Sequence, residues 1–141
     1  MSDRTRRLLL VEDDAAVALV YRLRLEMDGY EVIHATDGEE ALRLASAEVP
    51  DLILLDIRLP KMDGFEVLER LRLDPRTAHL QVVVVSNSLV GSPRMDAALT
   101  MGAREWMIKS QTTPAQLSER VRYWLEGRDK EDEAARWRAT S

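Results

Sequence analysis

Acidic residues directly follow two short apolar runs in this sequence. Glu12 and Asp13 come after Leu8–Val11. Asp56 comes after Leu52–Leu55 and before a segment rich in turn-forming residues. Apolar runs of this length that end at turn residues are typical of buried strands in a parallel sheet, and such sheets bind ligands just beyond the carboxyl ends of their strands. The acidic residues therefore stand where a functional site is expected.

A hydroxyl and a lysine occupy corresponding positions in the second half of the chain. Ser86 follows Leu80–Val85, and Lys109 follows Glu105–Ile108. Three carboxylates within a few ångströms of one another cannot all stay ionised cheaply unless a cation lies among them. A set of oxygen ligands without histidine or cysteine favours a hard ion, and Mg²⁺ in particular if waters complete an octahedron. Together with Ser86 and Lys109, such a site could neutralise a phosphoryl group carried by Asp56.

The elements that must bring these residues together are predicted by hydrophobic periodicity and by turn residues. We expect strands at Leu8–Val11, Glu31–Ala35, Leu52–Leu55, Leu80–Val85 and Glu105–Ile108. We expect helices at Ala15–Met27, Glu39–Ala47, Phe65–Leu73, Pro93–Met101 and Pro114–Glu126. Five strands thus alternate with five helices through connections of a few residues.

This alternation predicts an α/β fold of the flavodoxin-like, doubly wound type. Its five-stranded parallel sheet has right-handed crossovers, and helices cover both faces. The strand order 2-1-3-4-5 is one of the two common windings, and its switch point lies between the first and third strands. In this sequence these are the strands that end in Asp13 and Asp56. Ser86 and Lys109 should then lie on the same edge of the sheet.

Length and composition limit the protein class. A chain of 141 residues is typical of one domain that buries a core without disulfides. The sequence has no cysteine, no signal segment and no apolar run that approaches about 18 residues, so we expect a soluble, cytoplasmic protein without membrane contact. The net charge of -5 argues against direct binding of DNA.

We divide the chain into an N-terminal tail at residues 1–7, a domain at 8–126 and a charged C-terminal tail at 127–141. The C-terminal tail is too short for an output domain such as a DNA-binding module. We therefore expect signalling or binding through the surface of the domain itself.

The combined motifs resemble the receiver domain of two-component response regulators, in particular the single-domain, chemotaxis-type members. The resemblance covers roughly Leu8–Glu126. It rests on LLVED at 9–13, on LLDIRLP at 54–60 with MDG at 62–64, on Ser86 and on Lys109. Each motif alone is weak, but all of them in this order, each at the end of a strand, form a specific signal.

The resemblance implies a role for each acidic residue. Asp56 would be the phosphoacceptor that attacks the phosphohistidine of a sensor histidine kinase. Glu12 and Asp13 would hold Mg²⁺, with Asp56 and the backbone carbonyl of Arg58 as further ligands. The structural alternatives are that Asp56 caps the following loop and that Glu12 and Asp13 are an acidic helix start.

The resemblance also implies a switch. Ser86 would move to bond the phosphoryl group on activation, Lys109 would pair with that group, and Trp106 takes the place of the family's aromatic switch residue. A strand-end hydroxyl, a surface charge and a core aromatic are the corresponding structural alternatives. Phosphorylation would bias the surface formed by the predicted fourth helix, fifth strand and fifth helix, which could bind a downstream protein or form a homodimer.

The implied function is that of a phosphoprotein in phosphorelay signal transduction. It would not be an enzyme in the usual sense, because it catalyses only its own phosphorylation and dephosphorylation. Two alternatives within the family are a phosphorelay intermediate and a receiver-like scaffold that is not phosphorylated. A third alternative, a phosphohydrolase with an aspartate nucleophile, would want a second acid two residues after Asp56, where this chain has Arg58.

Four positions around Asp56 are expected to tune its chemistry. The family's lysine is normally followed by proline, often after a cis bond, but Ser110 follows Lys109 here. We expect a trans bond, because a cis bond before a residue other than proline costs about 2.5–4 kcal/mol. Asn87 is larger than the family's usual residue and should narrow access to the site. Arg58 and Ser88 stand where an attacking water would pass, so we hypothesise slow loss of phosphate.

Overall fold

The computed structural model describes residues 4–87 and 93–127. A single parallel sheet has the order β2-β1-β3-β4-β5, as the sequence predicts. Its strands are β1 (Arg7–Val11), β2 (Glu31–Ala35), β3 (Leu52–Leu55), β4 (Val82–Ser86) and β5 (Glu105–Ile108). The flavodoxin-like arrangement with five strands and five α-helices is confirmed for the described residues.

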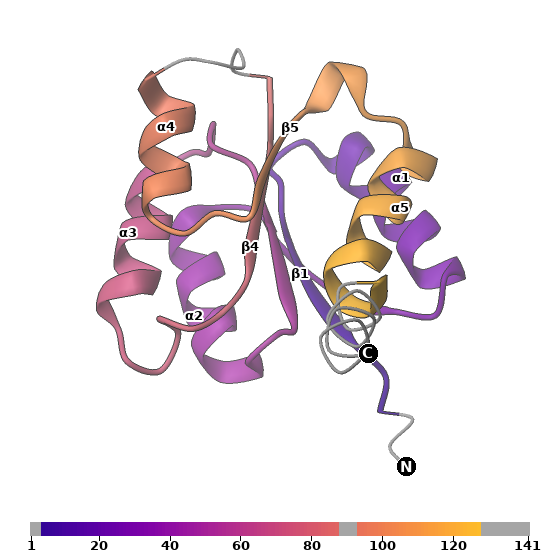
Figure 1. Cartoon of the computed structure of the whole chain (residues 1–141), viewed down its shortest axis with the longest axis horizontal. Helices are drawn as coiled ribbons and strands as arrows, with labels where there is room; N and C mark the ends of the chain where they lie inside the picture. The colour runs from indigo at the N-terminus through magenta and orange to yellow at the C-terminus, as the bar shows by residue number, and fades with distance from the viewer. Residues whose placement is uncertain (1–3, 88–92, 128–141) are drawn as a thin grey trace, which may run out of the picture.

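The α-helices lie on both faces of the sheet (Figure 1). They are α1 (Ala15–Met27), α2 (Gly38–Glu48), α3 (Gly64–Leu73), α4 (Pro93–Thr100) and α5 (Pro114–Arg122). Helices α2, α3 and α4 cover one face, and α1 and α5 cover the other. Among the described residues, no helix has both the length and the apolar character that are needed to span a bilayer.

Two cores form because successive side chains of a strand point to opposite faces. The face toward α2, α3 and α4 buries Leu9, Val11, Ile53, Leu55, Val82 and Val84. The face toward α1 and α5 buries Leu8, Leu10, Leu52, Leu54, Val83 and Val85. The central strands are apolar on both faces for this reason, and the sheet rigidly fixes the residues that follow each strand.

Side-chain caps start most of the helices close to the ends of the strands. Asp14 accepts hydrogen bonds from the backbone of the first turn of α1, Asp37 does so for α2 and Asp63 for α3. Thr113 and the third residue of α5 form a capping box. Such caps satisfy backbone N–H groups that have no partner within the helix, and they keep the loops at this edge of the sheet short.

The structure shifts several predicted boundaries, most of them by one or two residues and the end of the last α-helix by four. β1 begins at Arg7, because the backbone of Arg7 pairs with Glu31 of β2 and its carbonyl accepts the N–H of Asp51, so this residue belongs to the sheet rather than to a tail. The last α-helix ends at Arg122, and a π-helical turn (Tyr123–Gly127) follows it. Apolar spacing over one turn does not distinguish these two helix types. Residues 128–141 of the predicted C-terminal tail lie outside the described residues.

Candidate functional site

The structure brings the three predicted carboxylates together. β1 and β3 pair in parallel with Val11 opposite Leu55, so the residues after these two strands lie side by side. Glu12 is 2% exposed and Asp56 is 4% exposed, while Asp13 is exposed to solvent. One carboxylate oxygen of each residue lies within 4.8 Å of the others. This group has the geometry of a candidate metal site.

Lys109 bridges the two buried carboxylates. Its Nζ lies 2.7 Å from Glu12 Oε1 and 2.6 Å from Asp56 Oδ2. The lysine follows β5, and β4 lies between β5 and β3 in the sheet, so its long side chain reaches across the end of β4. The lysine is thus held at Asp56, which the resemblance predicts to be the phosphoacceptor.

Backbone N–H groups bind the remaining oxygens of the buried pair. Asp56 Oδ1 accepts a hydrogen bond from the N–H of Arg58 at 3.1 Å, and Glu12 Oε2 accepts one from the N–H of Asp14 at 2.9 Å. These bonds fix both carboxylates in direction. The charges still do not balance, since three carboxylates and one lysine leave a formal excess of two negative charges.

Burial and charge pairing act on the same groups in opposite ways. Burial raises the pKa of Glu12, and the bonds from Lys109 and from the Asp14 N–H only partly offset this. Burial by itself lowers the pKa of Lys109, but its bonds to Asp56 and Glu12 outweigh burial and raise that pKa. Lys109 pairs with two carboxylates, whereas Glu12 shares this lysine with Asp56. Charge pairing therefore outweighs burial for the lysine but not for Glu12.

Gly64 lets the loop after β3 fold tightly under Asp56. A Cβ atom at this position would lie 2.5 Å from the carbonyl oxygen of Asp56 and 2.6 Å from the Cα of Ile57, which no real side chain could tolerate. The Gly64 N–H donates to the Ile57 carbonyl at 2.8 Å. The MDG motif therefore has a structural reason at its glycine, which is the close approach of α3 to the site loop.

The donor set fits Mg²⁺. It consists of carboxylate oxygens, without a histidine or cysteine in the group, and it carries uncompensated negative charge. Hard oxygen donors with an exposed member that can take a hydrated ion are what Mg²⁺ prefers. The role of the Arg58 carbonyl as a further ligand stays a prediction.

Ser86 and Trp106 lie on β4 and β5, the two strands on one side of β3 in the sheet. Ser86 is the last residue of β4 and is fully buried. Leu55 pairs with Val84, so Ser86 lies about one residue beyond the level of Asp56 on the adjacent strand. Trp106 lies in β5, half-buried. Their switching roles stay predictions.

A group of aromatic and cation–π contacts joins Trp106 to two helices. This group was not predicted from the sequence. The rings of Trp106 and Phe65 have centroids 6.4 Å apart. The Arg94 guanidinium lies over the Phe65 ring, 4.7 Å from its centre. Arg94 Nη2 also pairs with Asp63 Oδ2 at 2.7 Å. β5, α3 and α4 are thereby connected. No local pattern signals this, because the residues are far apart in the sequence.

Two of the positions that depart from the resemblance bond each other. The Lys109–Ser110 peptide bond is trans, as expected. The N–H of Ser110 donates to Asn87 Oδ1 at 2.8 Å. The Arg58 side chain is exposed, and Ser88 lies outside the described residues. Whether Arg58 and Asn87 slow the loss of phosphate stays a prediction.

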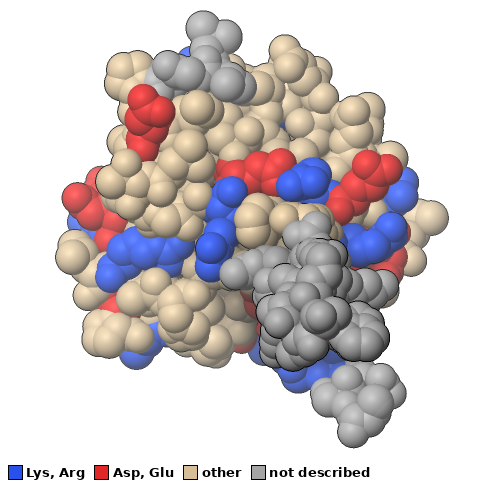
Figure 2. All heavy atoms as spheres, viewed as in Figure 1, with Lys and Arg blue, Asp and Glu red and all other residues tan. Residues whose placement is uncertain are grey.

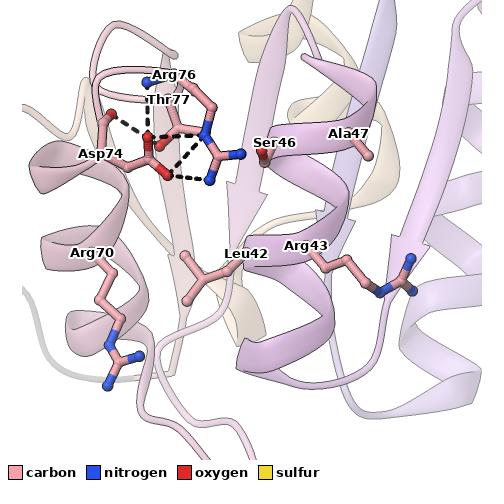
Figure 3. Close-up of a pocket in the computed structure, with 8 residues that line it drawn as sticks. All are labelled: Leu42, Arg43, Ser46, Ala47, Arg70, Asp74, Arg76 and Thr77. Carbon is pink, nitrogen blue, oxygen red and sulfur yellow. Dashed lines mark hydrogen bonds and ion pairs between the residues drawn. The ribbon is translucent and has the colours of Figure 1, made fainter.

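A hollow of the described surface lies away from these residues. It has a volume of about 710 Å³, and its lining comes from α2, from α3 and from the segment after α3 (Figure 3). Arg76 pairs with Asp74 at 2.8 Å, while Arg43 and Arg70 point away from each other. The hollow is near the carboxyl ends of these helices, which is the opposite end of the sheet from Asp56. Its charged groups do not converge on one point.

Comparisons with known proteins agree with this geometry. A family model described as the response regulator receiver domain matches residues 8–122. The chain is 38% identical over 130 residues to the DNA-binding dual master transcriptional regulator RpaA of Synechocystis sp., and the match covers 92% of this chain and 53% of that protein. The chain thus spans about half the length of the first curated relatives that it matches.

Solved structures show the same fold. The CheY-like receiver domain protein of Methanospirillum hungatei has a TM-score of 0.79 at 32% identity, over 91% of this chain and 99% of that one. The Mn(2+)-bound form of response regulator Rcp1 has a TM-score of 0.75 at 28% identity, over 86% of this chain and 95% of that one.

Proposed function

The chain belongs to the response regulator receiver family, and we propose that it accepts a phosphoryl group from a sensor histidine kinase onto Asp56, with Mg²⁺ as cofactor. Receiver domains are phosphoacceptor signalling modules. The observation that best supports the specific site is the buried pair of Glu12 and Asp56, bridged by Lys109 at the switch point of the sheet. A pair that only stabilised the fold would not need an excess of acid.

The proposed transfer is a displacement at phosphorus. A carboxylate oxygen of Asp56 forms a bond to phosphorus while the bond from phosphorus to the imidazole nitrogen breaks, and the electron pair stays on that nitrogen. Lys109 shifts from the Asp56 oxygen to a phosphoryl oxygen and stabilises the charge that develops there. Glu12, Asp13, Asp56 and the Arg58 carbonyl are the proposed Mg²⁺ ligands. The bound ion would neutralise phosphoryl oxygens and the excess charge of the carboxylates.

An apolar surface of α1 borders the site and suits a helix of the kinase. The exposed side chains are Leu19, Val20, Leu23 and Met27, which are 53%, 51%, 52% and 83% accessible. A hollow of about 470 Å³ that is lined by Val17 and Val20 also reaches Lys109. A kinase must bring its phosphohistidine to Asp56, so its docking surface must lie beside that residue. An exposed apolar helix face at this place meets that requirement.

The output is proposed to run through contacts of α4, β5 and α5 with a downstream protein or a second copy of the chain. Ser86 and Trp106 would report phosphorylation to this surface, and a nearly complete switch needs about 5 kcal/mol of differential stabilisation. Figure 2 shows this face, where acidic and basic side chains lie close together. Glu105 and Arg120 form one such pair at 2.9 Å. Mixed charge suits a protein partner better than nucleic acid.

Other parts of the proposal follow from the same site. We place the reaction in the cytoplasm, where sensor kinases present their phosphohistidine. Transfer of the phosphoryl group onward to a histidine domain would make the protein a phosphorelay intermediate. A scaffold that is not phosphorylated is disfavoured, because it has no use for a buried acid cluster around one lysine.

The test is chemical phosphorylation by acetyl phosphate with Mg²⁺. We expect one acid-stable, base-labile phosphoryl group per chain, measured by intact mass, and none in Asp56→Asn. Label that persists in Asp56→Asn would place the acceptor elsewhere. An absence of label in the unsubstituted protein, with no beryllofluoride complex either, would favour the scaffold. Turnover of a phosphomonoester would favour the phosphohydrolase.

A further inference from the structure

We infer that Asn87 is a positioning residue, whose carboxamide holds the turn that carries Lys109 against the end of β4. Asn87 follows Ser86, the last residue of β4. Its Oδ1 accepts the N–H of Ser110 at 2.8 Å, and Ser110 directly follows Lys109. This inference rests on the proposed function, since it concerns how Lys109 is aimed at Asp56.

The bond gives a partner to a backbone N–H of this turn. Lys109 is the first residue of the 3-10 turn η1 (Lys109–Gln111). The first N–H groups of a helical turn have no partner within the turn itself, and Asn87 supplies one for Ser110. On the other side, the N–H of Thr112 donates to the Lys109 carbonyl at 3.2 Å, and Thr112 Oγ1 donates to the Ile108 carbonyl at 2.6 Å. Asn87 therefore connects this turn directly to the residue after the neighbouring strand β4.

The Asn87–Ser110 bond matters because the charged group of Lys109 lies at the end of a long side chain, far from the backbone that the bond holds. Its Nζ reaches past the end of β4 to contact Glu12 at 2.7 Å and Asp56 at 2.6 Å. A lysine side chain has many rotatable bonds, so the position of its backbone decides where the charge can go. A misplacement of about 1 Å at a reacting centre can cost a large part of the rate.

Asn87 also couples the two halves of the proposed switch. It stands between Ser86 on β4 and the Lys109 turn after β5. If Ser86 moves toward a phosphoryl group, the Asn87–Ser110 bond carries that movement to the turn that holds Lys109. A backbone N–H at position 110 is required for this, and serine provides one where a proline would not.

The positioning role competes with the expectation that Asn87 shields Asp56 by its bulk. The two roles differ in what they need from the side chain. Asn87→Leu keeps the number and branching of the side-chain heavy atoms, and at least the bulk of asparagine, but has no acceptor. Asn87→Ala removes both the bulk and the acceptor. Positioning predicts that both variants react slowly. Shielding predicts that leucine behaves like asparagine and that alanine gives faster loss of phosphate.

The experiment measures the rate of phosphorylation by acetyl phosphate in the presence of Mg²⁺. We expect Asn87→Leu and Asn87→Ala to be slower by about fivefold each, the effect of one lost hydrogen bond on the transition state. Ser110→Ala is the matched control and should keep the rate, because the bond uses the backbone N–H. Asn87→Asp should be faster than Asn87→Leu, because it restores an acceptor oxygen.

Amide hydrogen exchange at Ser110 gives an independent readout. The Ser110 N–H should exchange slowly in the unsubstituted protein and in Asn87→Asp, and faster in the leucine and alanine variants. An unchanged phosphorylation rate in Asn87→Leu would overturn the positioning role while leaving Asp56 as the acceptor. If the unsubstituted protein took up no phosphoryl group at all, the proposed function would fall first.

Discussion

Strand β3 lies between two aspartates whose surroundings differ. Asp51, which precedes the strand, accepts bonds from Arg4 Nη2 at 2.7 Å and from the N–H of Arg7 at 2.8 Å. Its own N–H donates to the carbonyl of Arg7 at 2.8 Å. Asp51 is thus matched by a guanidinium and by a backbone N–H. This end of β3 is built for stability.

Asp56, which follows the strand, is the opposite case. It lies 2.6 Å from Lys109, but Glu12 binds the same lysine at 2.7 Å, and Asp13 adds a further negative charge. Both carboxylates of the lysine pair are almost fully buried, with side chains that are 3% and 5% exposed. Burying more acid than base costs stability, and it is maintained where a ligand can supply the missing charge.

The comparison separates two uses of the same residue type five positions apart, at the two ends of one strand. A carboxylate with balanced donors fixes the start of the sheet. A carboxylate with too few cations is the proposed site for a metal ion and a phosphoryl group. The difference in charge balance between the two arises from residues that the fold brings in from other parts of the chain.

The largest expected effect is an exchange of phenotypes between two isosteric substitutions. Asp56→Asn should lose all phosphorylation and keep its stability or gain up to about 1 kcal/mol, because it removes one of two buried acids that share a lysine. Asp51→Asn should keep phosphorylation and lose about 1–2 kcal/mol, because charged and backbone donors lose their acceptor. Intact mass after treatment with acetyl phosphate and urea unfolding measure the two quantities.

Each variant is the control for the other. The comparison fails if Asp51→Asn also stops phosphorylation, or if Asp56→Asn is the less stable of the two. In the second case the buried pair would be a net stabilising interaction, and its excess charge would not mark a binding site.

The cationic partners of the two aspartates, Lys109 and Arg4, should also differ in whether phosphorylation depends on them, with a somewhat smaller effect. Lys109→Ala is expected to slow phosphorylation by about a hundredfold, in the range seen when one stabilising group is removed from a transition state. Arg4→Ala, whose partner Asp51 is at the other end of β3, should leave that rate unchanged and cost at most about 1 kcal/mol of stability. Stopped-flow phosphorylation and urea unfolding test both. Equal rates in the two variants would contradict the assignment of Lys109.

The fold and the members of the site could be predicted from the sequence because both have local signals. Apolar runs on both faces mark the central strands, and the alternation with helices leaves few windings. Glu12, Asp56 and Lys109 each directly follow a predicted strand, so the parallel topology alone puts them on one edge. The predicted strand order and the proximity of these residues were correct for that reason.

The contacts that tune the site have no such signal. Asn87 and Ser110 each departed from the family pattern, but nothing in the sequence showed that they bond each other. Arg72 likewise donates to the carbonyls of Leu80 and Met101 at 2.7 and 2.8 Å, which joins α3 to the segments on both sides of β4. Such bonds depend on side-chain directions that exist only after the strands and helices have packed.

Metal binding should sharpen the comparison at the level of stability. Mg²⁺ at ten times its dissociation constant should raise the free energy of unfolding by about 1.4 kcal/mol. The increase should persist in Asp51→Asn and should largely vanish in Asp13→Asn, which keeps the buried pair but removes the exposed carboxylate. Urea unfolding with Mg²⁺ and with a chelator measures it. Equal stabilisation of both variants would mean that the ion binds elsewhere.

The smallest expected effect is the acid dependence of stability at Asp51. Burial by itself raises the pKa of Asp51, but the bonds from Arg4 and the Arg7 N–H outweigh it and lower the pKa. A carboxylate with a lowered folded-state pKa contributes stability that is present above its unfolded pKa of about 3.9 and is lost as the pH falls through the folded value.

The free energy of unfolding should therefore fall more in the unsubstituted protein than in Asp51→Asn as the pH is lowered from about 5 to about 2. These two pH values lie on either side of the unfolded pKa of an aspartate. The Asp51→Asn variant should still lose some stability over this pH range, because Asp37 and Asp74 remain in it. Their pKa values are also lowered, by the Glu40 N–H and by Arg76 respectively. Urea unfolding at a series of pH values tests this. Parallel curves would mean that the donors around Asp51 hold its position without favouring its charge, and the contrast with Asp56 would then rest on geometry alone.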